Sequence, residues 1–501
     1  MILQRYYDQR LAQASYLVGC SAAGEAIVID PNRDVEQYMR VAAAAGLRIS
    51  AVTETHIHAD FVSGSRELAA LTGAVLYLSD EGGPDWRYAD ADAVGARPLK
   101  DGDVVRIGNL RLEVLHTPGH TPEHLSFLLT DAPATDRPIG VFTGDFVFVG
   151  DVGRPDLLEK AANVAGNAVI AARTQFHSLA RFKRFPDYLQ IWPGHGAGSA
   201  CGKGLSAVPQ STVGYERLAN WAFAIEDEGA FAREVLEGQP EAPTYFARMK
   251  RINRDGPPVL GGFRRPARLP AQRLDAVLAG GGLVIDTRHA ADFAAGHVPG
   301  TISIPFDSSF VTWAGWLVSY DRPFHLVIDD RCTHCLDEAV CELAKIGLDD
   351  VAGYFGTEVI AAWETTDRAL RSVKQITSGE LAALVERGDA TVIDVRGRSE
   401  WEAGHIPGVP NIPLGYLGER ANELPRDRPL VLQCQSGTRS AIGAGVLQAR
   451  GFTNVSNLLG GFAAWRSAGH PIVSAATTLP VTQVPPVASS GSEHPQMFQS
   501  R

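Results

Sequence analysis

The sequence lacks several features that would assign the protein to whole classes. It has six cysteines in 501 residues, which is too sparse for a disulfide scaffold. No run approaches the roughly 18 apolar residues of a membrane span, and the N-terminus has no apolar signal-peptide core. The net charge is −11 and no stretch concentrates basic residues, so we expect neither a membrane nor a nucleic acid as partner. These absences predict a cytoplasmic chain whose useful cysteines are reactive rather than structural.

The composition and the order of apolar runs indicate a folded α/β protein. Hydrophobic residues make up 45% and charged residues 21%, as is usual for a chain with a buried core. At roughly 150 residues per domain, the length favours about three domains. The first 200 residues alternate predicted strands with predicted helices. The strands are expected at 26–30, 49–53, 112–115 and 140–142, and the helices at 35–45 and 65–72.

The second half of the chain contains an internal repeat. Residues 214–250 are predicted to be helical, and Gly256-Pro257-Pro258 then marks a domain boundary. Residues 283–305 and 391–413 match at one constant offset, which predicts two similar domains of about 100 residues, each a small parallel α/β unit. After residue 474 the chain becomes rich in proline and serine, and a disordered tail is expected.

Histidine and aspartate clusters follow several predicted strands of the first domain. In chain order they are His56, His58 and Asp60, then His116 and His120, then Asp145, then His195. Loops at strand ends commonly carry ligand and catalytic groups. The order His-x-His-x-Asp, Gly-His, Gly-Asp, Gly-His resembles the metallo-β-lactamase fold over about residues 1–220, specifically its glyoxalase II and persulfide dioxygenase branch. The resemblance implies an αββα sandwich.

Phe61 distinguishes between the members of this branch. Binuclear zinc hydrolases of the fold have a metal-binding histidine at this position, and a phenyl ring cannot ligate, so a single metal is favoured. The resemblance to persulfide dioxygenases implies one Fe(II) per chain, and its ligands map onto His56, His120 and Asp145. Two histidines and one carboxylate leave positions for O2 and substrate. His58, Asp60 and His195 are then expected to orient these ligands or bound water, while His116 and His124 are interpreted as structural.

Two further residues near these clusters are candidates for contacts with a substrate. Arg154 either binds an anionic thiol or pairs with Asp151 or Asp156. Cys201 lies shortly after His195 and is either a sulfur acceptor near the metal or a small residue packed in a glycine-rich turn. The residues alone leave both alternatives open.

The second repeat carries a candidate catalytic cysteine. Cys434 lies between a predicted buried strand and a helix, where backbone N–H groups and the helix dipole favour a thiolate. Arg439 adds a positive charge that suits anionic sulfur compounds. With the segment 404–408 and the closing Gly460-Gly461-Phe462, this pattern resembles a rhodanese sulfurtransferase domain, which implies that Cys434 carries sulfur as a persulfide.

The first repeat departs from the rhodanese pattern. Counted back from Gly347 and Gly451, Asp330 occupies the position of Cys434, so this copy is expected to be inactive and to act as a spacer or docking module. Cys332 and Cys335 lie in the same loop. A shift of two residues would place Cys332 at the active position, and the CxxC pair is alternatively a metal or redox site.

The complete chain resembles a persulfide dioxygenase fused to two rhodanese domains. The expected domains are residues 1–255 (metallo-β-lactamase fold), 266–370 (inactive rhodanese-like) and 374–474 (active rhodanese), followed by a tail at 475–501. The resemblance implies oxidation of glutathione or coenzyme A persulfide by O2 to sulfite, with thiosulfate formed or consumed at Cys434, in sulfide detoxification. A homo-oligomer is also expected.

Two other functions remain open at this stage. One is a zinc-dependent thioester hydrolase of the glyoxalase II type fused to a sulfurtransferase, against which Phe61 argues. The other is a sulfur carrier or sensor in which the metal is structural and Cys434 only relays sulfur.

Overall fold

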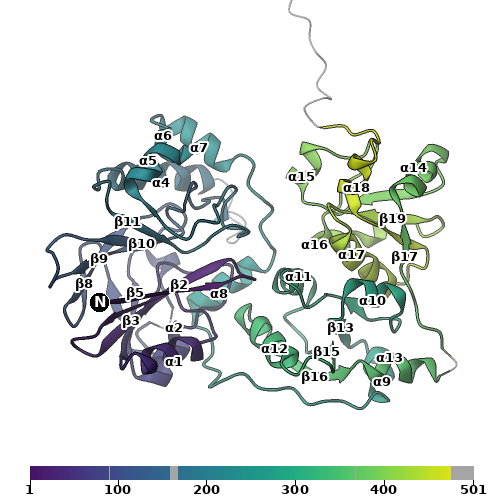
Figure 1. Cartoon of the computed structure of the whole chain (residues 1–501), viewed down its shortest axis with the longest axis horizontal. Coiled ribbons are helices and arrows are strands. Elements are labelled where there is room, and N and C mark those ends of the chain that lie inside the picture. The colour runs from purple at the N-terminus through teal and green to yellow at the C-terminus, as the bar shows by residue number, and fades with distance from the viewer. Residues whose placement is uncertain (90, 158–166, 367, 475–501) are drawn as a thin grey trace, which may run out of the picture.

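The computed structural model describes residues 1–89, 91–157, 167–366 and 368–474. The predicted tail, 475–501, lies outside the described residues. Four β-sheets organise this part of the chain, two of six strands and two of four. In Figure 1 the six-stranded sheets lie on the left, with the third sheet at lower right and the fourth at upper right. The mixed α/β class expected from the sequence is confirmed.

Two sheets of the N-terminal half pack face to face between helices. The first sheet consists of β1 (Ile2–Asp8), β2 (Gln13–Cys20), β3 (Glu25–Ile29), β4 (Arg48–Thr53), β5 (Val75–Ser79) and β6 (Arg97–Leu99) in that order. The second runs in the order β12 (Ser211–Thr212), β11 (Gln190–Pro193), β10 (Gly140–Gly144), β9 (Leu125–Asp131), β8 (Leu110–His116) and β7 (Val104–Ile107).

The helices of this half lie in the connections between strands or follow the last strand. They are α1 (Glu36–Ala44), α2 (Ser65–Thr72), α4 (Asn167–Phe182), α5 (Val213–Ala219), α6 (Trp221–Ala224), α7 (Glu228–Leu236), α8 (Phe246–Asp255) and the 3-10 helix η1 (Pro84–Trp86). One apolar cluster joins the two sheets, and two others join α1 and α2 to the first sheet and α4 and α7 to the second. The result is the four-layer αββα arrangement that the sequence predicted.

Residues 214–250 form several short helices rather than one long one. Asn220 and Asp227 each accept a hydrogen bond from a backbone N–H two or three residues further on and so begin new helices. Pro240 and Pro243 then separate α7 from α8. The prediction of helical structure over 214–250 is therefore correct for most residues. The capping side chains and prolines divide the segment into separate helices.

The repeated segments build the two four-stranded sheets. The third sheet has the order β14 (Ile302–Ser303), β13 (Leu283–Asp286), β15 (Phe324–Ile328) and β16 (Val351–Gly356), and the fourth has β17 (Lys374–Ile376), β20 (Val455–Leu458), β19 (Leu430–Gln433) and β18 (Thr391–Asp394). All these neighbours are parallel. Asp286 pairs with Arg288 in one copy and Asp394 with Arg396 in the other, so the repeat extends to side-chain contacts.

The helices of the two repeats connect these strands. The first repeat contains α9 (Arg273–Ala279), α10 (Ala290–Ala295), α11 (Phe310–Leu317), α12 (Cys335–Lys345) and α13 (Glu358–Glu364). The second contains α14 (Ser378–Arg387), α15 (Arg398–Ala403), α16 (Leu414–Leu417), η2 (Glu419–Glu423), α17 (Thr438–Ala449) and α18 (Gly461–Ser467). We keep 1–255, 266–370 and 374–474 as proposed domain limits. Within the described ranges, no helix combines the length and the apolar character needed to cross a bilayer.

Strand register refines the comparison of Cys434 with the first repeat. Asp394 lies opposite Gln433, and the equivalent Asp286 lies opposite Val327. Counted from the strands, the residue that matches Cys434 is therefore Ile328, whereas counting from the helix ends gives Asp330. The first repeat has two extra residues in the loop between these points, and neither count places a cysteine opposite Cys434.

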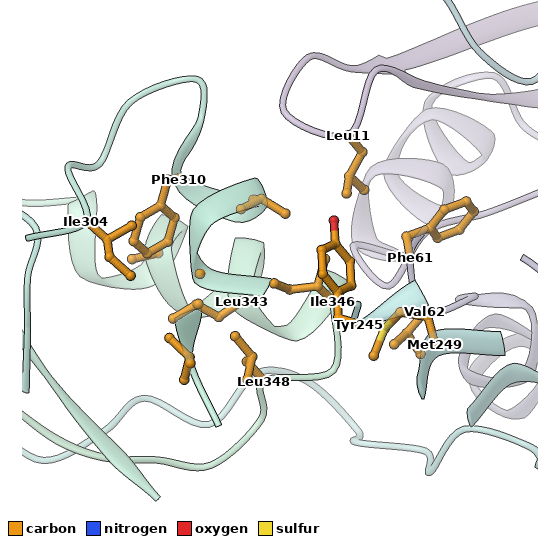
Figure 2. Packing of buried hydrophobic residues seen from close by; sticks show 14 of the residues in the cluster. Leu11, Phe61, Val62, Tyr245, Met249, Ile304, Phe310, Leu343, Ile346 and Leu348 are labelled. Atoms are coloured by element: carbon orange, nitrogen blue, oxygen red, sulfur yellow. The ribbon is translucent and has the colours of Figure 1, made fainter. Parts of the chain in front are cut away.

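The first repeat shares a hydrophobic core with the N-terminal half. Phe61, Val62 and Met249 pack in one buried cluster with Leu343 and Ile346 from the end of α12 (Figure 2). The backbone N–H of Val62 also donates to the carbonyl of Lys345 at 2.7 Å. The end of α12 therefore lies directly against the loop that follows His56, a predicted metal ligand.

A buried ion cluster completes this interface. The ammonium of Lys345 lies 2.6 Å from Asp8 and 2.8 Å from Glu342, and its side chain is only 6% exposed. Burial lowers the pKa of Lys345, but the two carboxylates outweigh this effect and raise it. Removal of Lys345 would leave the carboxylates of Asp8 and Glu342 without the ammonium that lies closest to both.

We expect Lys345→Met to destabilise the protein by about 3–5 kcal/mol, because the buried partners lose their cation. The first transition in urea unfolding measures this change. Arg331→Met is the control: it removes an ion pair with Asp329 from a side chain that is 82% exposed, which should cost less than about 1 kcal/mol. Equal effects of the two substitutions would contradict a structural role for the buried cluster.

Candidate metal centre and cysteine site

Four loops at strand ends converge on one buried site. His56 follows β4, His120 follows β8, Asp145 follows β10 and His195 follows β11. All four residues are buried. The structure thus brings together clusters that are up to 139 positions apart in the chain, at the strand ends where the sequence predicted them.

Three of these side chains form a group with the dimensions of a metal site. One ligand atom each from His56, His120 and Asp145 lies within 4.8 Å of the others. The Oδ2 atom of Asp145 is 4.0 Å from Nε2 of His56 and 3.6 Å from Nε2 of His120. This is the ligand set that the sequence predicted, and two imidazoles with one carboxylate suit a divalent transition metal.

Hydrogen bonds outside this group orient its members. Nδ1 of His120 donates to the carbonyl of Arg154 at 3.0 Å. The ring proton is therefore on Nδ1, and the lone pair of Nε2 faces the space beside Asp145, where it can bind a metal. Nδ1 of His56 lies 2.9 Å from the hydroxyl of Thr55. The N–H of Asp145 donates to Nε2 of His124, which gives His124 the structural role expected for it. Burial and the neighbouring histidines hold the pKa of His56 well below its usual range, so the ring is neutral, as a metal ligand must be.

The buried atoms at this site fit a cation. Among the described residues, no N–H or O–H group donates to either carboxylate oxygen of Asp145, and Nε2 of His195 and Oδ2 of Asp60 also have no hydrogen-bond partner. A buried carboxylate without a partner is costly. A metal ion held by His56, His120 and Asp145 would compensate the charge and use the lone pairs.

His58 differs from the three candidate ligands. Its Nε2 lies 3.1 Å from Oδ1 of Asp30, so the nitrogen that the other histidines turn towards the site is engaged elsewhere. Burial lowers the pKa of His58, but Asp30 and then Asp60 and Glu54 raise it to about 9. His58 therefore lies beside the site with its Nε2 turned to Asp30, and its role in orienting ligands or bound water stays a prediction.

A second group of potential ligands lies on the other side of Asp145. Asp60, His195 and Cys201 each offer an atom within 4.8 Å of the others. His195 donates from Nδ1 to the carbonyl of Ala12, and its Nε2 is 3.2 Å from Asp60 and 3.4 Å from Asp145. Cys201 is buried beside these groups, which matches the alternative that places it near the metal. His195 is thus oriented in the same way as His120.

Arg154 has a different environment from a substrate-binding residue. Its guanidinium is fully buried and pairs with both oxygens of Asp156, while a third nitrogen donates to the carbonyl of Ala200. Of the two alternatives, the structure therefore shows pairing within the loop. Arg154 contacts the site through its backbone: its carbonyl accepts from His120 and its N–H donates to the carbonyl of Cys201.

Several residues that support the site were not found from the sequence. Asp30 accepts from the backbone N–H and hydroxyl of Thr55, and Asn253 on α8 donates to the carbonyls of His58 and Phe61. Asp30 follows an apolar run, which is a usable sequence signal. Asn253 has no such signal, because only the tertiary approach of α8 brings it to the loop.

A basic cavity lies beside the loop that carries His120. It has a volume of about 790 Å³ and is lined by Gly119, Trp86, Lys250, Arg251 and Arg254, among others. Burial lowers the pKa of Lys250 to about 8, although Glu123 opposes the shift. The cavity therefore offers several cationic groups next to the metal-binding loop.

Cys434 lies in a second, separate site at the end of β19. Its sulfur is fully buried and accepts hydrogen bonds from the N–H of Gly437 at 3.1 Å and the hydroxyl of Ser440 at 3.3 Å. These donors favour negative charge on the sulfur. The N-terminus of α17 faces the same loop, as predicted.

Arg439 is beside this loop but is already paired. Its two terminal nitrogens lie 2.6 and 2.8 Å from the carboxylate of Glu400. Burial opposes the charged form of Arg439, but Glu400 and Cys434 raise its pKa. Any anion bound by Arg439 has to share it with Glu400.

Comparison with known proteins identifies two regions of the chain. Residues 9–195 match the metallo-beta-lactamase superfamily, and residues 377–468 match the rhodanese-like domain. A crystal structure of a metallo-beta-lactamase from Staphylococcus aureus is similar at 42% identity and a TM-score of 0.64. The similarity covers 71% of this chain and 99% of that one, which is more than the N-terminal half alone.

Curated relatives carry two different activities in their names. A hydroxyacylglutathione hydrolase of Polaromonas is 34% identical over 197 residues, covering 39% of this chain and 66% of the relative. The human mitochondrial persulfide dioxygenase ETHE1 is 29% identical over 202 residues, covering 39% of this chain and 68% of the relative. The chain thus spans slightly less than two thirds of the length of the first of these.

We expect Asp145→Asn to weaken metal binding by at least about 10–100-fold, because the amide removes the negative charge that balances the ion. Metal content after dialysis, measured by plasma mass spectrometry, tests this. His116→Ala is the control, since His116 bonds to the carbonyl of Pro122 outside the group. An unchanged metal content in Asp145→Asn would contradict the assignment.

Proposed function

Because the chain belongs to the metallo-beta-lactamase superfamily and carries a C-terminal rhodanese-like domain, we propose that it oxidises a low-molecular-weight persulfide with O2 and transfers sulfur at Cys434. The observation that carries this proposal is the group of His56, His120 and Asp145 beside Phe61. The ring of Phe61 is fully buried in the core shared with α12. A second metal therefore lacks the histidine that its site has in binuclear relatives.

The proposed reaction is RSSH + O2 + H2O → RSH + SO3²⁻ + 2H⁺. When bound, Fe(II) supplies the redox chemistry that makes O2 reactive towards sulfur. The described residues hold the neutral imidazoles in place and exclude bulk water from the site. Asp60 and His195 lie 3.2 Å apart on the other side of Asp145, and we assign to them the acceptance of the protons released.

The basic cavity supports an anionic thiol as the carrier of the persulfide. Lys250 and Arg254 line it, and the adjoining Gly119 precedes His120. Glutathione and coenzyme A both carry negative charges away from their sulfur atom, so cations at a distance from the metal would hold either carrier with its sulfur towards His120. We therefore assign the carrier to this class.

Cys434 supplies the second half of the proposed activity. A persulfide on Cys434 reacts with sulfite to give thiosulfate, Cys434–SSH + SO3²⁻ → Cys434–SH + S2O3²⁻, and the reverse reaction loads the cysteine. Donors from Gly437 and Ser440 stabilise the thiolate that leaves. Fusion of the two sites raises the local concentration of sulfite. We place this chemistry in sulfide detoxification in the cytoplasm, and propose a homo-oligomer.

A zinc-dependent hydrolase remains the second candidate. Asp60, His195 and Cys201 form a group with ligand spacing on the far side of Asp145. Two metals bound there and at His56 would suit hydrolysis of a thioester, the activity named for the Polaromonas relative. Phe61 is the residue that argues against this alternative.

Oxygen consumption by anaerobically purified, Fe(II)-loaded protein tests the proposal. On addition of glutathione persulfide, and then of coenzyme A persulfide, we expect O2 uptake with sulfite or thiosulfate as product. His56→Ala should abolish the uptake because a ligand is lost, while sulfur transfer from thiosulfate to cyanide persists. Cys434→Ser should show the opposite pattern.

The outcomes separate the three candidate functions. Failure of O2 uptake with both persulfides, together with hydrolysis of a hydroxyacylglutathione by the zinc-loaded protein, would establish the hydrolase instead. Sulfur transfer with neither of these activities would leave a sulfur carrier. His116→Ala, outside the metal group, should resemble the wild type in every assay.

A further inference from the structure

The loop between β15 and α12 carries a sulfur cluster that the proposed function does not use. A disulfide joins Cys332 and Cys335, and the sulfur of Cys332 lies 3.7 Å from Nε2 of His334. Cys335 is the first residue of α12, a helix of 11 residues. Both cysteines are half-buried and His334 is exposed, so the cluster is reachable from solvent.

This disulfide is expected to add little to the stability of the fold. The two cysteines are only three positions apart, and a crosslink that closes so short a loop removes little entropy from the unfolded chain. The flanking elements are held without it, because β15 pairs with two neighbouring strands and α12 packs into the shared core. Stability alone does not account for the pair.

The surroundings of the pair favour thiol chemistry. The N-terminal N–H groups of α12 and the helix dipole stabilise a thiolate on Cys335. The imidazole of His334 is close enough to exchange a proton with Cys332. By contrast, Cys20, Cys201 and Cys434 are buried. Within the described residues, the pair therefore combines access to solvent with activation.

The position of the pair in the fold is also informative. The loop from β15 to α12 corresponds to the loop from β19 to α17 that carries Cys434. In the second repeat the sulfur directly follows the strand, whereas in the first repeat Ile328 and Asp330 occupy the matching positions and the sulfurs lie at the helix end. The first repeat thus has no cysteine at either position that matches Cys434, and carries a CxxC pair at the start of its helix.

We propose that Cys332 and Cys335 form a thiol–disulfide exchange site for low-molecular-weight thiols and their disulfides. The step is Cys332–S–S–Cys335 + 2 RSH ⇌ Cys332–SH + Cys335–SH + RSSR. One small thiolate attacks a protein sulfur, which breaks the Cys332–Cys335 bond and gives a mixed disulfide. A second small thiolate then attacks the sulfur of the bound small thiol, which releases RSSR and the second protein thiol. Two electrons pass from the small thiols to the protein, and the two protons end on the protein thiols. The step requires neither the metal nor Cys434.

Equilibration of the full-length protein with glutathione buffers tests this proposal. After acid quenching, denaturation and alkylation, cleavage at Arg331 and Lys345 releases one peptide that contains Cys332, Cys335 and Cys341. We expect three labels on it in glutathione and one in glutathione disulfide, with a reversible midpoint between. Cys341 is the internal control, since it should be labelled at every ratio.

Two variants test the mechanism. Cys332→Ser should retain one glutathione on Cys335 as a mixed disulfide in oxidising buffer, because the resolving thiol is gone. His334→Gln should slow the exchange and leave its midpoint unchanged, with a loss of the pH dependence that proton exchange gives the wild-type rate. A merely structural histidine would not alter that rate profile.

Three results would overturn the proposal. One label at every glutathione ratio would make the disulfide permanent, and three labels at every ratio would mean that the pair does not close. The third result is that the reduced wild-type protein keeps Zn²⁺ through dialysis and no longer forms the disulfide in glutathione disulfide. This result would make the cluster a metal site. None of these readouts uses O2 uptake, so they are independent of the proposed function.

Discussion

The buried carboxylate of Asp145 is the constraint around which the N-terminal half is organised. Its Oδ2 atom faces the imidazoles of His56 and His120, and no N–H or O–H group of the described residues donates to either oxygen. Such a charge is tolerated in the interior only when a cation balances it. Backbone carbonyls orient the histidines. Nδ1 of His120 donates to the carbonyl of Arg154 and Nδ1 of His195 donates to that of Ala12, so that each Nε2 lone pair faces the site. A cation bound by His56, His120 and Asp145 would balance this charge.

The second organising feature is the contact between this site and the first repeat. The end of α12 packs against Phe61 and Val62, which follow His56 in the chain, and Asn253 links the same loop to α8. The repeat that lacks the transfer cysteine thus forms a wall behind the metal-binding loop. The first repeat therefore contributes apolar side chains and one backbone hydrogen bond to the packing around the loop that follows His56.

The α/β class and the site clusters could be predicted because both depend on local patterns, whereas the four layers were implied by the resemblance to the metallo-β-lactamase fold. Apolar runs ending at His56, Asp145 and His195 place the side chains at strand ends, and strand ends converge. The partner of Arg154 was not predictable, because Asp151 and Asp156 both lie within three positions of it in sequence. Asn253 is 195 positions from His58, and only packing of α8 brings them together. The match of Asp330 with Cys434 depended on counting from one end of a loop that contains an insertion.

The central claim is that a single ferrous ion with exchangeable positions occupies the group formed by His56, His120 and Asp145. The most direct test is electron paramagnetic resonance of the anaerobic iron-loaded protein exposed to nitric oxide, together with metal analysis. We expect one iron per chain and the spectrum of a ferrous–nitrosyl centre, lost in His120→Ala. Two tightly bound zinc ions per chain, with no nitrosyl signal after iron loading, would contradict this account.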